Sequence, residues 1–486
     1  MVTAAVIGSG PNGLVGAVTL ARAGLDVTVY ESDSVPGGGC RTEELTLPGF
    51  HHDVGSAVHP MAMTSEFFRA FGLTERVPYV TPDISFAHGI APDRIAVAYR
   101  DIRRTAAGLG RDGRAWTRAF EGLSRRLPEL AGLLGAPLAE GPRHPVLAAR
   151  LAGSVLANFP AGLPRLGGEN ARALFAGAAA HGIGNTRSLA LTAVGVVLAA
   201  HAHGPRGWPL PIGGAGAVTA ALVEDLRAHG GRITTGVRIA SIHDVGDAAV
   251  VLCDTSARDL AAIGADVLPT KYLRSLRRFR YGNGSAKVDF ALSGPVPWSA
   301  QELRESPTVH LGGTAAQVAA SERAVARGNL VEQPYILVVQ PSLVDSTRAP
   351  AGSAALWAYV HVPAGSDLDA TEYISAEIER YAPGFRDLIL GSAATSACQL
   401  EARNPNFIGG DIGSGATNFA QLLARPRLAR EPWRTPTPGL YLGSAAVPPG
   451  PGVHGSGGFY AARAALSDLG IAIPSLAPSP EVGRPD

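Results

Sequence analysis

The chain has 486 residues, which is too many for one ordinary hydrophobic core and predicts two or three domains. Its content of 46% hydrophobic and 17% charged residues is typical of a globular protein and excludes a disordered or repeat-built chain. Because 42 basic side chains balance 41 acidic ones to a net charge of +1, no broad basic field is available for a nucleic-acid partner.

The three cysteines, Cys40, Cys253 and Cys398, are far apart and odd in number, without the spacing of a metal site. His51, His52 and Asp53 could suggest a metal, but no further ligand cluster supports one. No basic and apolar leader precedes the first predicted strand. We therefore expect a cytoplasmic protein without a metal.

The first predicted strand covers residues 3–7 and leads into a glycine-rich turn, a helix and a second strand. In such a βαβ unit, Gly8 permits the tight turn, Gly10 lets the backbone approach a pyrophosphate, and Gly13 allows close helix packing. The start of the helix then offers unpaired N–H groups to the phosphates. This order of elements predicts a dinucleotide site.

An acidic residue ends the second predicted strand: Glu31 lies 23 residues after Gly8. An acid at this place can accept hydrogen bonds from both hydroxyls of an adenosine ribose, and its charge repels a 2′-phosphate. The pattern therefore favours FAD or NAD over NADP.

A second glycine-rich loop follows directly and reads SDSVPGGGCRT. Its backbone N–H groups and the guanidinium of Arg41 can contact a diphosphate that the first turn already holds. The alternative is a surface turn with an incidental arginine, and the position of the loop after Glu31 favours the diphosphate role.

Two internal stretches test other possibilities. The apolar run from Leu189 breaks at His201 and is therefore too short to span a bilayer. A buried helix is favoured over a membrane-dipping one. The turn GGAGAV at Gly213 has Thr219 where a third glycine is needed, and a poor strand precedes it. The sequence therefore predicts no second nucleotide site.

Near the C-terminus, a short predicted strand over residues 440–442 leads into another glycine-rich turn and a helix that begins near Gly457. A second helix N-terminus is thus aimed at a polar group. In a flavoprotein that group is the pyrimidine edge of the isoalloxazine, which becomes negative on reduction.

Taken in order, these motifs resemble the phytoene desaturase-related, FAD-dependent oxidoreductases. The resemblance covers nearly the whole chain and also includes PGFHHDVGSAVHP, YGNGSAKVDFALSGPVPW and GVHGSGGFYAARAAL. It implies an amine-oxidase-like α/β fold in which a Rossmann-type FAD-binding domain carries an inserted α+β substrate domain. One FAD lies extended between the two domains.

The resemblance also implies which residues contact FAD. Gly38 and Arg41 fall at the pyrophosphate and ribityl region, Val237 contacts adenine through its backbone, and Gly55 and Ser56 approach the flavin ring. The full set of predicted cofactor-binding residues is Gly8, Gly10, Pro11, Asn12, Gly13, Glu31, Ser32, Gly38, Gly39, Arg41, Gly55, Ser56, Val237, Gly443, Ser444, Gly452, Val453 and His454.

In a fold of this type the FAD-binding domain is discontinuous. We expect it to comprise residues 1–75, 205–275 and 390–470. The substrate domain then comprises residues 76–204, which read as mostly helical, and 276–389, whose β-rich runs suit an antiparallel sheet over the flavin. Residues 471–486 read as a loose tail.

The predicted chemistry is that of a dehydrogenase or desaturase, in which flavin N5 takes a hydride from an apolar, isoprenoid or other secondary-metabolite substrate. No motif identifies a catalytic base. His59 and His454 are substrate-side candidates, each with packing or cofactor ordering as the alternative. Without a second nucleotide site, oxygen or a quinone is the expected electron acceptor.

Three alternatives stay open: an isomerase or cyclase that uses reduced FAD without net oxidation, an amine oxidase, and a non-catalytic flavin-binding scaffold. The amine oxidase is disfavoured because no aromatic pair is placed to cage an amine. Peripheral membrane contact also stays open, and the sequence predicts no oligomeric state.

Overall fold

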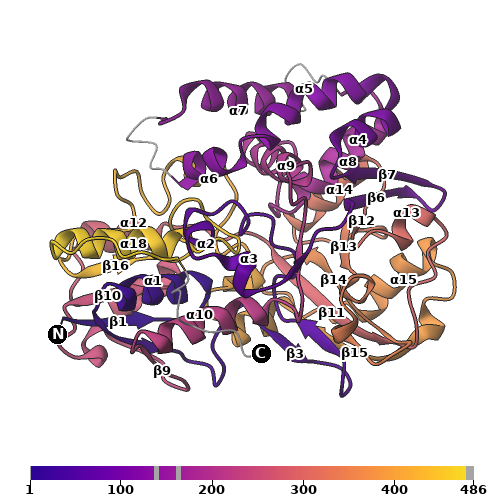
Figure 1. The fold of residues 1–486 in the computed structure, drawn as a ribbon. Helices are drawn as coiled ribbons and strands as arrows, with labels where there is room; N and C mark the ends of the chain where they lie inside the picture. The colour runs from indigo at the N-terminus through magenta and orange to yellow at the C-terminus, as the bar shows by residue number, and fades with distance from the viewer. Residues whose placement is uncertain (1, 136–141, 160–165, 478–486) are drawn as a thin grey trace.

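The computed structural model describes residues 2–135, 142–159 and 166–477. Its framework is two large sheets, one of five strands and one of seven, with a layer of helices above the second (Figure 1). Each sheet is assembled from segments that lie far apart in the sequence.

The five-stranded sheet is entirely parallel and has the order β16-β10-β1-β2-β9. The central strands β1 and β10 are buried on both faces, as parallel strands require, whereas the edge strand β9 is partly exposed. The strands are β1 (Thr3–Ile7), β2 (Asp26–Tyr30), β9 (Arg232–Thr234), β10 (Val250–Cys253) and β16 (Leu440–Leu442).

Helices cover both faces of this sheet, because successive strand side chains point to opposite sides. Ala4 and Val6 of β1 pack with one set of helices, α1 (Pro11–Arg22), α10 (Gly216–Ala228) and α18 (Ser456–Asp468). Ala5 and Ile7 pack with the other set, α11 (Ala257–Ile263) and α12 (Thr270–Arg277). The predicted βαβ unit, the strand over 440–442 and the final helix are all confirmed.

The seven-stranded sheet has the order β15-β11-β14-β13-β12-β6-β7 and is antiparallel except between β12 and β6. The β-rich region predicted over 276–389 supplies most of it, so that prediction is confirmed. The strands are β6 (Ile84–Ala91), β7 (Arg94–Tyr99), β11 (Gly284–Leu292), β12 (Thr308–Leu311), β13 (Ile336–Val339), β14 (Ala354–Val362) and β15 (Ile389–Thr395).

Residues 76–204 are mostly helical, as predicted. The region also contains the hairpin of β6 and β7, which joins the second sheet through β12 and was not predicted. The pairing of β6 with β12 joins residues more than 200 positions apart, and local periodicity does not report such a contact. The rest of the region forms the helices α4 (Ile102–Gly108), α5 (Gly113–Ser124), α6 (Leu127–Gly135), α7 (Pro145–Asn158), α8 (Glu169–Ala180) and α9 (Leu189–Ala202).

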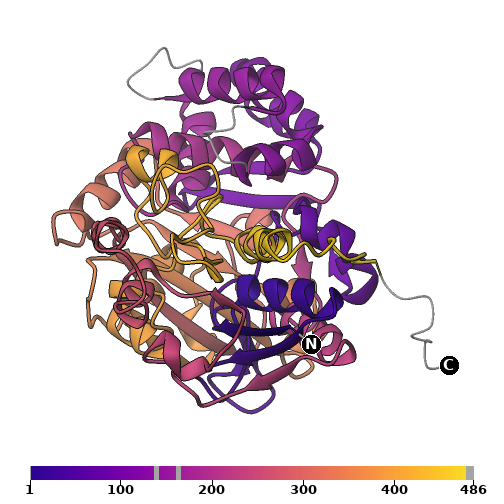
Figure 2. The ribbon, with the colours of Figure 1, turned by 90° about the vertical axis from the view of Figure 1, so that its left-hand side faces the viewer.

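These helices form a layer that both views place at one end of the molecule (Figures 1 and 2). The apolar run from Leu189 is the buried helix α9, as predicted. In the described ranges, no helix combines the length and the apolar character that crossing a bilayer requires.

The remaining elements are short or lie at the edges of the two sheets. Residues 475–477, in the segment predicted as a tail, are held against α1 by Arg22, whose Nη1 donates to the carbonyls of Ser475 and Ala477. Residues 478–486 of that tail lie outside the described residues. The other helices and strands are β3 (Thr42–Glu44), β4 (His51–Asp53), α2 (Glu66–Ala70), α3 (Leu73–Arg76), β5 (Tyr79–Val80), β8 (Leu210–Pro211), α13 (Gln301–Arg304), α14 (Ala315–Val325), α15 (Thr371–Tyr381), α16 (Ala397–Arg403) and α17 (Phe419–Leu423).

Candidate cofactor and substrate site

A cavity of about 1290 Å³ extends from the glycine-rich turn after β1 to one face of the seven-stranded sheet. Most of the predicted cofactor residues meet on its wall, although they come from both ends of the chain. The predicted residues that line it are Gly8, Gly10, Pro11, Asn12, Glu31, Ser32, Gly38, Gly39, Arg41, Gly55, Ser56, His59, Val237, Ser444, Gly452 and Val453.

The turn after β1 has the backbone that a dinucleotide site needs. Gly8 has a φ of +97°, a conformation that glycine adopts without strain. Gly10 begins α1 without a side-chain cap, and Pro11 stands in the first turn, where a missing N–H costs nothing. The open start of this helix can therefore present N–H groups and its positive dipole end to a diphosphate.

Four glycine backbones lie in two close contacts beside this turn. A Cβ on Gly38 would lie 3.2 Å from Cα of Gly10, and a Cβ on Gly55 would lie 2.4 Å from the carbonyl oxygen of Gly39. Side chains at these positions would push the loops apart and fill the space between them. The glycines thus keep a backbone-lined cradle, which fits a diphosphate.

Asp254 is a site residue that the sequence analysis missed. It follows β10, and its Oδ2 accepts a hydrogen bond of 2.9 Å from the N–H of Gly13. Burial raises its pKa to about 7. The available signal was its place directly after a central parallel strand, where ligands of such sheets bind.

Glu31 is buried and accepts hydrogen bonds at both carboxylate oxygens. Oε2 accepts from the N–H and the hydroxyl of Ser9, at 2.9 and 2.5 Å. Oε1 accepts from the hydroxyl of Ser32 and the N–H of Asp33. A ribose hydroxyl can replace either serine hydroxyl, because both serines can rotate about χ1.

Arg41 lies on the cavity wall but is already paired with two carboxylates. Its Nη1 donates to Asp33 at 2.7 Å, and its Nε lies 3.2 Å from Glu43. The N–H of Val237 donates to the carbonyl oxygen of Glu31 at 2.9 Å, which fixes this segment beside the acid. The predicted contacts of both residues with FAD stay predictions.

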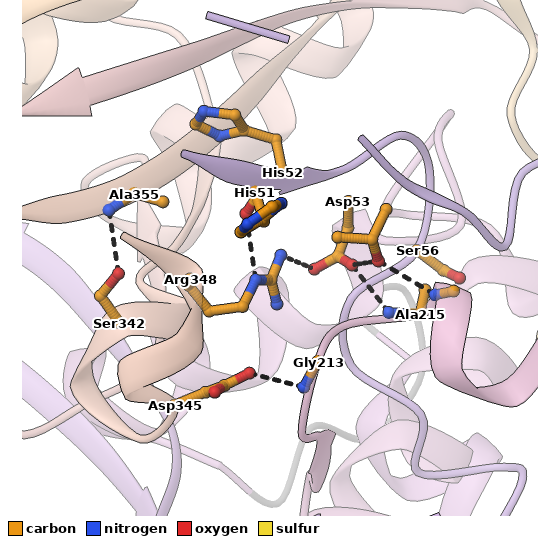
Figure 3. Close-up of polar contacts among 12 residues, drawn as sticks. His51, His52, Asp53, Ser56, Gly213, Ala215, Ser342, Asp345, Arg348 and Ala355 are labelled. Atoms are coloured by element: carbon orange, nitrogen blue, oxygen red, sulfur yellow. Dashed lines mark hydrogen bonds and ion pairs between the residues drawn. The ribbon is translucent and has the colours of Figure 1, made fainter. Parts of the chain in front are cut away.

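Asp53, at the end of β4, anchors the loop that carries Gly55 and Ser56. One oxygen of Asp53 accepts from the N–H of Ala215, and the other is paired with the guanidinium of Arg348 at 2.8 Å (Figure 3). Arg348 also donates through Nε to the carbonyl oxygen of His51. The loop is therefore held on a buried polar network.

The same network occupies the start of α10, where a second nucleotide would have to bind. The N–H of Gly213 donates to Asp345 (Figure 3). The N–H of Gly216 donates to the hydroxyl of Thr42. With Ala215 bound to Asp53, the amides of this turn are taken by protein oxygens. This arrangement agrees with the prediction that GGAGAV is no nucleotide turn.

The two histidine candidates differ in place. His59 lines the cavity, where its Nε2 lies 3.1 Å from the hydroxyl of Ser56. His454 does not line it; its Nε2 donates to the carbonyl oxygen of Gly450, and its Nδ1 accepts from the N–H of Ser456. Burial lowers the pKa of each to about 4, so both are neutral at pH 7.

Two other predicted cofactor residues also lie behind the wall. Gly13 packs its backbone on Gly8, where a Cβ would lie 2.2 Å from the carbonyl oxygen. Gly443 packs against α18, where a Cβ would lie 3.1 Å from Cα of Gly458. Both glycines bring a helix close to the sheet and do not face the cavity.

The far wall is one face of the second sheet, and none of its residues was predicted from the sequence. Alternate positions of β11, β13 and β14 point to the cavity, among them Lys287, Leu337 and Trp357, whereas the intervening residues pack with α15. Lys287 is buried and paired with Asp289. Only the alternation within each strand signalled which side chains face inward.

Within residues 2–135, 142–159 and 166–477, no group of three or more His, Cys, Asp or Glu side chains is arranged to hold a metal ion. The possible ligand His52 lies instead beside Asp289, with 3.5 Å between Nδ1 and Oδ1. Desolvation and the charge of Lys287 lower the pKa of His52 to about 3.

Residues 6–71 match the family model of the NAD(P)-binding Rossmann-like domain. The chain is 26% identical to pyridine nucleotide-disulfide oxidoreductase domain-containing protein 2 of Rattus norvegicus, over 96% of this chain and 93% of the relative. Cyclohexylamine oxidase from Brevibacterium oxydans has a TM-score of 0.56 at 16% identity, covering 96% of this chain and 99% of its own. Reduced UDP-galactopyranose mutase has a TM-score of 0.54 at 14% identity, with coverages of 98% and 95%.

These similarities and the observed topology confirm the predicted α/β fold with a Rossmann-type dinucleotide-binding region. The finer resemblance to phytoene desaturases stays a prediction, as does the choice of FAD.

Proposed function

We propose that the protein is an FAD-dependent dehydrogenase or desaturase that oxidises an apolar substrate. The observation that carries the proposal is the single continuous cavity, which joins the glycine cradle to an apolar wall. In such a site the cofactor and the substrate can lie against each other without water between them.

The residues of the cradle fit FAD by their chemistry. The start of α1 and the amides near Gly38 would hold the diphosphate, Glu31 the adenosine ribose, and the loop at Gly55 the ring system. FAD, when bound, supplies an acceptor for a hydride. The protein then has to position the substrate and keep the site dry.

The lining indicates the class of substrate. The helical layer contributes Leu133, Leu151, Val155 and Leu198 to the cavity, and the sheet contributes Leu337 and Val339. Burial of a hydrocarbon against such a wall yields roughly 25 cal/mol for each Å² of apolar surface. An isoprenoid or another apolar secondary metabolite satisfies this wall better than a charged amine does.

An isomerase or cyclase that needs reduced FAD but causes no net oxidation is the second candidate. The similarity of fold to UDP-galactopyranose mutase favours it over a non-catalytic scaffold. The two candidates differ in electron balance, because only the oxidase or dehydrogenase consumes one acceptor for each product.

The test begins with the purified protein. We expect a flavin absorption spectrum, release of FAD on denaturation, and anaerobic bleaching by at least one compound from a panel of carotenoid precursors, polyketides and amines. A protein that stays colourless after FAD is supplied contradicts the proposal. Product formation without acceptor consumption favours the isomerase instead.

A further inference from the structure

Three histidines from three separate elements meet at the wall of the cavity. His88 of β6 and His310 of β12 are register partners in parallel strands, and His181 follows α8. Nε2 of His181 lies 2.8 Å from Nε2 of His310. Nε2 of His88 donates to the carbonyl oxygen of Gly313. His88 and His310 are fully buried, whereas His181 lines the cavity.

The contact between His181 and His310 links the tautomers of two rings. One nitrogen must donate and the other must accept. When His181 donates through Nε2, its Nδ1 carries a lone pair; when His310 donates, Nδ1 of His181 carries the hydrogen. That Nδ1 has no hydrogen-bond partner among the described residues, and it is not among their fully buried polar atoms. His181 can therefore offer the cavity a base or an acid at one atom.

Among the residues that the structure describes, no other hydrogen bond fixes His310 in one tautomer. Its Nδ1 and that of His88 are buried and have no hydrogen-bond partner within these residues, and both face Gly177 of α8. A Cβ on Gly177 would lie 2.7 Å from Nδ1 of His310 and 2.4 Å from Nδ1 of His88. The helix thus passes the two rings without a side chain that could hold the proton on one nitrogen.

The segment after His181 is held in a strained conformation. Ile183 has a φ of +48°, which is rare for a β-branched residue. The N–H of Gly184 donates to one oxygen of the buried Glu322 at 3.0 Å, and His361 pairs with the other at 2.5 Å. Strain that is fixed in this way clusters at functional sites, because the surroundings must hold it.

We propose that Nδ1 of His181 accepts the proton that the substrate loses, with His310 as the residue that positions it. This inference rests on the proposed function. The substrate gives a hydride to FAD and a proton from the neighbouring carbon to Nδ1, and a C=C bond forms between the two carbons. The substrate is oxidised by two electrons, FAD is reduced by two, and no other reactant is consumed.

A weakly basic imidazole is sufficient for this step. Desolvation lowers the pKa of His181 to about 3, so the ring is neutral at pH 7 and its lone pair is free. Loss of the hydride leaves positive charge on the substrate, which makes the adjacent C–H strongly acidic. The ring therefore has to accept a proton from a group far more acidic than an alkane.

Diethyl pyrocarbonate tests the accessible nitrogen on the FAD-loaded protein without any substrate. At pH 6 we expect peptide mass spectrometry to find His181 modified, whereas His88 and His310 react only after unfolding. In His310→Leu the modification rate of His181 should change at least threefold, and in His310→Gln, which keeps a polar partner, it should return toward the wild-type rate. An unreactive His181 in the folded protein overturns the proposal.

Rapid-mixing measurements of flavin reduction test the proton transfer, using the compound that bleaches the flavin. His181→Gln should slow reduction about 100-fold, the low end of the effect of a general base, with the FAD content unchanged. The exposed His243→Gln is the matched control and should react as the wild type does. If flavin is reduced in His181→Gln at the same rate as in the wild type, this inference alone is overturned. If the wild-type protein contains no FAD, the proposed function is overturned.

Discussion

The guanidinium of Arg348 and the carboxylate of Asp53 form an ion pair in which the side chains are only 1% and 0% exposed. The two residues are 295 positions apart. Their contact joins the loop before β14 to the strand that leads to Gly55 and Ser56. A buried charge without its partner is costly, so this pair fixes the loop at the cavity.

We expect Arg348→Met to lower the free energy of unfolding by about 3–5 kcal/mol, because it leaves the carboxylate of Asp53 buried and unpaired. Urea denaturation measures the change. Arg125→Met is the control, since Arg125 is paired with Glu121 on the surface and the loss should stay below about 1 kcal/mol. Equal losses in the two variants would contradict the role of burial.

Gly10→Ala tests the cradle. The φ of Gly10 is −62°, so alanine fits the backbone, but its Cβ would lie 2.6 Å from Oδ2 of Asp254 and would stand between α1 and a diphosphate. We expect FAD affinity to fall at least 100-fold, measured by fluorescence titration. Gly153→Ala in α7 is the control: its Cβ would meet no described atom within 4 Å, and the variant should bind FAD as the wild type does.

The contrast between these residues shows what sequence can predict. Gly10 and the strand Leu440–Leu442 lie in local patterns whose spacing carries the information, and both were predicted. Arg348 acquires its role only when β4 folds against it, and His181 only when β12 lies beside β6. Neither contact leaves a trace in the neighbouring sequence, so neither residue could be found before the fold was known.

Asp254→Asn should remove a dependence of stability on pH. The pKa of Asp254 rises from 3.8 to about 7 on folding, so the folded state holds a proton that the unfolded state releases. The stabilisation from this group is complete below about pH 4 and is lost as the pH rises to about 7. Urea titrations measure the free energy of unfolding of both proteins at pH 4 and pH 8. We expect the free energy of unfolding of the variant, relative to that of the wild type, to be higher at pH 8 than at pH 4.

The same variant predicts a change in cofactor affinity. A carboxylate bound to the N–H of Gly13 competes with a diphosphate for the positive end of α1, whereas the neutral amide does not. Above pH 7 we expect FAD to bind about tenfold more tightly to Asp254→Asn, a change equivalent to about 1.4 kcal/mol. If the dissociation constant for FAD at pH 8 is the same in Asp254→Asn and the wild type, the diphosphate does not bind at the start of α1.

His203 makes the opposite contribution to the pH dependence. Its Nε2 accepts from the indole N–H of Trp116 at 2.8 Å, and its Nδ1 donates to the carbonyl oxygen of Tyr99 at 2.7 Å. Burial lowers its pKa from 6.5 to about 4. A proton on Nε2 would also face the indole N–H of Trp116. The folded state thus excludes a proton that the unfolded state binds, so this stabilisation is complete above pH 6.5 and is lost as the pH falls to about 4.

We therefore expect His203→Gln to cost about 1–3 kcal/mol at pH 7, where the wild type has both hydrogen bonds, and less at pH 5, where the wild type has already lost part of this stabilisation. The free energy of unfolding of each protein at the two pH values decides the matter. His243→Gln, at an exposed site, should follow the wild type at both. A penalty that is the same at pH 5 and pH 7 would mean that folding does not shift the pKa of His203, and it would contradict the prediction.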